Sequence, residues 1–176
     1  MSVIASDMKL KFSVAAAAGN TTAGTAATSL GDQVSTADLA SGVIGNLFDD
    51  VSSAEASAGD VEYRCVFVCN DHATDTAFNV TVAIQSEVAL GANYDLATDG
   101  IAVTARAAAT AQALTVANES TAPSGGAGVS AYGDGPLTIG TMGPLTVAGV
   151  WVRRTVTAAT APLSSDGATI RIAGEG

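Results

Sequence analysis

The sequence is poor in the residues that carry nucleophilic catalysis, metal binding and nucleic-acid binding. Its 176 residues include one histidine, two cysteines and only seven lysines and arginines, against 17 aspartates and glutamates, so the formal net charge is −10. Binding to nucleic acid relies on clustered Lys and Arg, and this charge balance opposes it. Two cysteines are too few for a disulfide scaffold, and any Ser-His or Cys-His mechanism would depend on the single histidine.

Long apolar runs are also missing. No run approaches the roughly 20 residues that a membrane-spanning helix needs, so we expect no membrane contact. The first residues contain an apolar stretch, Phe12–Ala18, that follows Lys9 and Lys11. The alternation of polar and apolar residues from Met8 to Val14 is typical of a strand and makes a poor signal peptide.

What the sequence does contain is β-branched residues, 19 glycines and many short Ser/Thr/Ala connectors, in a length that suits one domain. We therefore predict an all-β fold, a single β-sandwich of the jelly-roll or immunoglobulin-like type. Residues 1–41 are expected to form an N-terminal strand followed by an extended arm. Residues 42–176 are expected to form the sandwich, with a long Gly/Ser/Ala loop at 120–143. Loops of that length are usually functional or disordered, and we expect the arm and the loop to contact neighbouring chains.

The clearest strand is Val61–Cys69, which has apolar residues on both faces and is therefore expected to be central in a sheet. A polar turn connects it to a second alternating strand, Ala77–Gln85, which indicates a hairpin. A short helix is expected over Ser52–Ala58, with Ser52 or Ser53 as its cap and Gly59 at its end. Further strands are predicted at 8–14, 101–105, 113–117, 145–147, 150–156 and 168–173.

Cys65, Cys69 and His72 resemble a metal site only at first sight. In one strand the α-carbons of the two cysteines would lie about 13 Å apart, too far for a disulfide or for one zinc ion. We interpret both cysteines as small core residues and His72 as a residue of a surface turn. The glycine-rich run Gly126–Ala131 follows no hydrophobic strand and opens no helix, so it is not a dinucleotide-binding motif.

Five carboxylates, Asp49, Asp50, Glu55, Asp60 and Glu62, gather in one stretch of the sequence. They could offer oxygen ligands to Ca²⁺, but they lack the alternating spacing of a calcium loop. A solvated acidic face is the simpler interpretation. We therefore predict no catalytic residues, no cofactor and no metal, and a protein that is not an enzyme.

The few basic residues are more informative, because Trp and Arg are frequent anchors of protein interfaces. Alternation places Trp151 and Arg153 on one face of a strand and Arg154 on the other, with Val150, Val152 and Val156. Two interpretations stay open: interface anchors, or a core tryptophan with arginines paired to carboxylates. The candidate interface residues are Trp151, Arg153, Arg154, Lys9 and Lys11.

Two parts of the chain are similar to small structural proteins of tailed bacteriophages. The first is Asn46–Val51 followed by Glu55–Val68, in which an acidic turn precedes a strand that contains Glu62-Tyr63-Arg64; a polar turn and an alternating strand follow. The second is Val150–Val156 followed by Asp166–Gly174. The resemblance covers less than half of the chain. It implies a β-sandwich that coats or cements a capsid, or a subunit of a tail, and it implies no site residues.

We accordingly expect a head decoration or cement protein that binds the outer surface of the capsid lattice. Its partners would be the major capsid protein and further copies of itself, as a dimer or trimer, and it would be located on the virion after assembly in the host cytoplasm. The alternatives are a tail or baseplate subunit and a β-sandwich module that binds carbohydrate or a cell surface.

Overall fold

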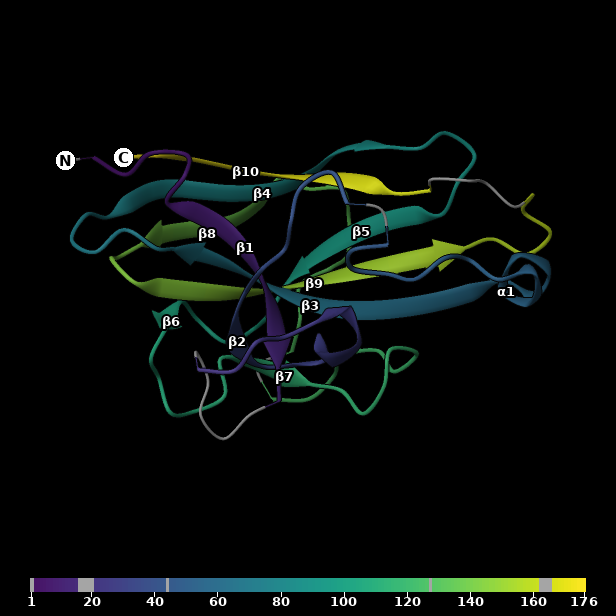
Figure 1. Ribbon diagram of the computed structural model, residues 1–176, viewed down its shortest axis with the longest axis horizontal. Helices are drawn as coiled ribbons and strands as arrows, with labels where there is room; N and C mark the ends of the chain where they lie inside the picture. The colour runs from purple at the N-terminus through teal and green to yellow at the C-terminus, as the bar shows by residue number, and fades with distance from the viewer. Residues whose placement is uncertain (1, 16–20, 44, 127, 162–165) are drawn as a thin grey trace.

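A computed structural model describes residues 2–15, 21–43, 45–126, 128–161 and 166–176, and Figure 1 shows its ribbon. Its regular structure is almost entirely β, which confirms the predicted all-β class. The strands are β1 (Met8–Val14), β2 (Gly31–Asp38), β3 (Asp60–Asn70), β4 (Ala77–Glu87), β5 (Asn93–Thr98), β6 (Thr104–Ala105), β7 (Ala113–Thr115), β8 (Leu137–Met142), β9 (Thr146–Val156) and β10 (Ala168–Glu175).

The strands form two antiparallel sheets that pack as a sandwich. The large sheet has the order β5-β9-β3-β1-β2-β7, and β6 also pairs with β9; the small sheet has the order β10-β4-β8. In Figure 1 the small sheet lies at the top of the molecule, and β2, β6 and β7 lie at the bottom. The core between the sheets takes side chains from both, including Val66 and Val68 from β3 and Val80 and Val82 from β4.

The large sheet is buried on its other face as well. The alternate residues of β3, including Cys65 and Phe67, contribute to a second hydrophobic cluster with Trp151 of β9. Side chains from the segment after β6 pack onto that face, among them Val129 and Tyr132. The prediction that β3 is central and apolar on both faces is therefore confirmed, and part of the 120–143 segment covers the protein's own core.

The extended arm predicted for residues 15–41 is wrong for residues 31–38, which form β2. This strand pairs with β1 on one side and β7 on the other. Its only large apolar buried residue is Val34, which is fully buried; Gln33 and Ser35 beside it are buried although they are polar. The Val34 amide donates to Oε1 of Gln112 at 2.9 Å. Polar side chains and backbone pairing hold this strand in place, so it lacks the alternation that marks a strand in sequence.

Other boundaries also differ from the prediction. The predicted strands 145–147 and 150–156 are parts of β9, only residues 104 and 105 of the predicted 101–105 strand pair, and β5 and β8 were not predicted. Helix α1 (Ser53–Ala58) is confirmed: the Glu55 amide donates to Oγ of Ser52 at 3.2 Å, and the Gly59 amide donates to the Glu55 carbonyl. A single 3-10 turn, η1, covers Ala26–Thr28. Among the described residues, no helix has the length and apolar character to cross a membrane.

Candidate interaction surface

The structure places Trp151 in the second core, where its side chain has no exposed area. Its indole Nε1 donates to Oδ2 of Asp99 at 2.8 Å. The same carboxylate also accepts from the amides of Leu114 and Ile101, so Asp99 is a buried anion with three donors. Of the two interpretations left open by the sequence, the core position is the observed one, and Trp151 is not accessible to a partner in this fold.

Arg154 lies on the opposite face of β9 and is also buried. Its Nε donates to Oε2 of Glu62 at 2.6 Å, and its Nη1 donates to the Asp49 carbonyl at 2.5 Å. The guanidinium carbon lies 5.0 Å from the ring centre of Phe48, and that ring meets Tyr94 edge-on. Burial opposes the charge of Arg154, but the adjacent Glu62 carboxylate outweighs this effect and leaves the pKa of Arg154 above its ordinary value.

The other three candidate interface residues also form ion pairs within the chain. Arg153 donates through Nε (3.1 Å) and Nη2 (2.5 Å) to Oδ2 of Asp95, and it stacks over the ring of Tyr132. Nζ of Lys11 lies 2.5 Å from Oδ1 of Asp38, and Nζ of Lys9 lies 3.1 Å from Oδ2 of the same residue. These residues therefore stabilise the sandwich itself, and a further contact with a partner stays a prediction.

The two cysteines and the histidine are structural in this fold. Cys65 and Cys69 are free thiols without exposed area, and burial raises the pKa of both well above the ordinary value. Nδ1 of His72 accepts from the amides of Asp75 at 2.9 Å and Thr74 at 3.3 Å. The imidazole thus caps its own turn, in agreement with its interpretation as a turn residue.

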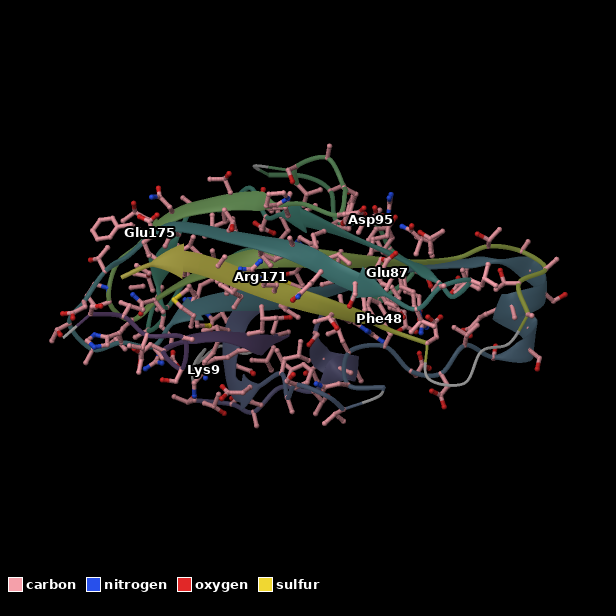
Figure 2. The ribbon with its side chains drawn as sticks, turned by 90° about the horizontal axis from the view of Figure 1, so that it is seen from above. Lys9, Phe48, Glu87, Asp95, Arg171 and Glu175 are labelled. Carbon is pink, nitrogen blue, oxygen red and sulfur yellow. The ribbon has the colours of Figure 1, made fainter. Side chains whose placement is uncertain are left out.

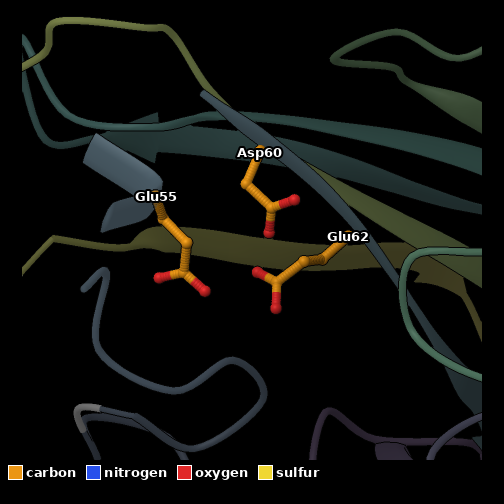
Figure 3. Close-up of side chains that lie close together, drawn as sticks. All are labelled: Glu55, Asp60 and Glu62. Atoms are coloured by element: carbon orange, nitrogen blue, oxygen red, sulfur yellow. The ribbon is translucent and has the colours of Figure 1, made fainter. Parts of the chain in front are cut away.

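Three of the five clustered carboxylates meet at the start of β3. One oxygen each from Glu55, Asp60 and Glu62 lies within 4.8 Å of the others (Figure 3), and among the described residues this is the acidic group able to hold a metal. Two of the three already have donors: Glu55 accepts from the Ser52 amide at 2.6 Å, and Glu62 accepts from Arg154. The cluster thus has local partners that account for its geometry, and it carries no metal assignment.

A groove opens on one side of the sandwich, and we call it the main groove. It has a volume of about 830 Å³ and lies between β10, the end of β4 and the segment 39–51. A narrower hollow of about 490 Å³ continues along β10 toward residues 3–5. Both hollows are lined by Leu10, Leu39 and Ile170, so together they follow β10 over its whole length.

The main groove combines apolar walls with negative charge. The carboxylates that line it are Asp49, Asp50, Glu87 and Asp166. Burial, reinforced by the nearby Asp166, raises the pKa of Tyr94 to about 12, so this groove residue stays protonated. Figure 2 shows Glu87 and Phe48 beside the first residues of β10.

Aliphatic side chains stand exposed at the rim of the main groove. Val43 and Val88 line it and are 56% and 39% exposed, and Leu90, in the same turn as Val88, is 87% exposed. Such clustering of exposed aliphatic residues is typical of an interaction site. The sequence did not predict this surface, because Val43, Val88 and β10 line one groove only through the pairing of the strands.

Comparison with known protein families, with curated proteins and with solved structures gives no match.

Proposed function

We propose that the protein is a non-enzymatic decoration protein of a tailed bacteriophage head, which binds the outer surface of the capsid lattice and stabilises it. The observation that carries the proposal is the main groove with its exposed aliphatic rim, Val43, Val88 and Leu90. The resemblance of Asn46–Ala83 and Val150–Gly174 to small phage structural proteins supports the same assignment.

The groove indicates the chemistry of the segment that would bind there. Its carboxylates favour a segment with basic side chains, and its apolar walls favour aliphatic ones, so a segment of the major capsid protein with both kinds of residue would be complementary. A protein that binds only the assembled shell stabilises it by mass action. The net charge of −10 would also keep many copies on one particle from adhering to released DNA.

A carbohydrate-binding module is less compatible with this surface. Sugar-binding platforms present exposed aromatic rings, and among the described aromatic residues only Phe78 is exposed, at 49%. A tail or baseplate subunit would share the fold and the groove with a decoration protein, and would differ from it in copy number.

The proposal predicts the copy number of the chain in purified particles of the virus that encodes it. Gel densitometry against the major capsid protein should give copies on the order of hundreds, in a simple ratio to the capsid subunit. A few copies to a few tens per particle would indicate the tail or baseplate. Absence from the particles would overturn the proposal.

The role of the groove rim can be tested with a matched pair of variants. Leu90 and Leu145 are exposed leucines with positive φ angles of 68° and 53°, in turns at opposite ends of the molecule. Aspartate tolerates such angles, so both variants should fold. Leu90→Asp should reduce the copies bound per particle about tenfold, since it places a charge in the contact. Leu145→Asp should bind like the wild type, and equal binding by both variants would exclude the rim.

A further inference from the structure

Strand β10 is an edge strand whose outer side is open. It pairs with β4 alone, and the described residues show no backbone hydrogen bond from β10 to any other segment. In an antiparallel ladder every second residue turns both its N–H and its C=O away from the partner strand. β10 therefore offers roughly four residues with unpaired backbone groups, which is a template for the addition of another strand.

The irregular pairing of the small sheet does not protect this edge. The ladder has two irregularities, one between Thr169 and Ile170 and one between Ala173 and Glu175. At both, the extra residue belongs to β4 and not to β10. β10 itself alternates regularly: Ile170 and Ile172 are half-buried and pack against the core, while Thr169 and Arg171 are exposed. A regular, unbulged edge is the kind that accepts a second strand.

The segment before β1 meets the C-terminal end of β10, where a side chain on Gly176 would contact the backbone of Val3. Among the described residues, no backbone hydrogen bond joins that segment to β10. The outer backbone groups of β10 are therefore unpaired.

This edge carries one basic and one acidic side chain for which the described residues show no ion pair. Among the described residues, Arg171 is the only one of the seven lysines and arginines without an ion pair. Its neighbour across the ladder is Ala83, which offers no charge. Glu175 likewise has no cationic partner; its Oε2 accepts from Nδ2 of Asn79 at 3.1 Å. Figure 2 shows Arg171 in the middle of β10 and Glu175 at its end.

We propose that two copies of this chain associate through antiparallel pairing of their β10 edges, centred on Ala173. This register places Arg171 of each copy opposite Glu175 of the other, on the exposed face, where opposite charges across a ladder attract. On the inner face it places Ile172 opposite Gly174. The two small sheets then form one continuous sheet across the two-fold axis.

The exposed ring of Phe78 fits the same register. Phe78 is the ladder partner of Glu175 and is 49% exposed. In the paired sheet, Glu175 lies between this ring and the guanidinium of the second copy. Salt screens the attraction between partly buried charges less than the attraction between fully exposed ones. The association is measured in solution without particles.

The test is a charge reversal with rescue, followed by sedimentation velocity of the full chain over a range of concentrations. Arg171→Glu and Glu175→Arg should each weaken dimerisation about tenfold, because each places two pairs of like charges across the ladder. The double variant Arg171→Glu/Glu175→Arg should return to within about threefold of the wild type. Asp134→Arg, an exposed charge reversal away from β10, should have no effect.

Melting temperatures of the variants show whether the monomers remain folded, which is expected because both side chains are exposed. A wild-type chain that is monomeric at all concentrations would overturn the proposal. A dimer that neither single variant weakens would also overturn it, as would a double variant weaker than both single ones. The copy number on particles is a separate measurement, so the two proposals can fail separately.

Discussion

Replacement of Trp151 by alanine is expected to lower the free energy of unfolding by about 3–5 kcal/mol, the range for the loss of a buried aromatic side chain. The side chain is fully buried, and its loss would leave a cavity in the cluster formed by Cys65, Phe67 and the residues around them. It would also remove one of the three donors to the Asp99 carboxylate. Urea denaturation followed by circular dichroism measures the change.

Trp151→Phe separates the two contributions. Phenylalanine retains most of the apolar volume but cannot donate to Asp99, so this variant should lose only about 1–3 kcal/mol, the cost of one unsatisfied buried group. A loss below about 1 kcal/mol in Trp151→Ala would contradict the core position, since even small cavities cost that much.

Replacement of Arg154 by methionine is expected to cost about 3–5 kcal/mol, because it leaves a buried carboxylate without its counter-charge. Glu62 is 2% exposed and lies on the partner strand of β9 in direct register with Arg154. The double variant Arg154→Met/Glu62→Leu should be more stable than Arg154→Met, since it removes the uncompensated charge. A double variant less stable than the single one would show that the pair does not act as a unit.

The same variant should acquire a pH dependence with a defined sign. Burial already raises the pKa of Glu62 above its ordinary value of 4.5 although Arg154 opposes the shift, so the loss of Arg154 should raise this pKa further. A carboxyl group whose folded pKa is raised favours the folded state at low pH, and that contribution is lost as the pH rises through the folded pKa. The destabilisation by Arg154→Met should therefore be smaller at pH 4 than at pH 7.

Local patterns predicted the elements whose stability is local. α1 follows from the serine cap and the terminal glycine, and β3 and β9 follow from alternating apolar residues whose two faces enter two cores. The alternation of residues also predicted that Trp151 and Arg154 lie on opposite faces of one strand. It could not show that the Trp151 face is covered, because the covering residues, among them Val129 and Tyr132, come from a segment without periodicity.

β2 and the groove along β10 show more clearly which features cannot be predicted from sequence patterns. β2 depends in part on Gln112, far away in sequence, whose Oε1 accepts from the Val34 amide. The alternation of residues 168–173 predicted a strand, but whether a strand lies at an edge depends on how the other strands pair. The unpaired state of Arg171 and the exposed rim around Leu90 follow from that pairing, so both surfaces became visible only in the structure.

The central position of β1 determines the order in which the large sheet can be completed. Met8 pairs with Asn70 of β3, and Asp60 of β3 pairs with Val156 of β9. Each of these strands can therefore complete its pairing only after a strand that is synthesised much later has emerged. Contacts between residues so distant in sequence require the closure of long loops, and domains dominated by them fold slowly, in roughly milliseconds to seconds. During synthesis, β3 therefore keeps one side unpaired until nearly the whole chain has emerged.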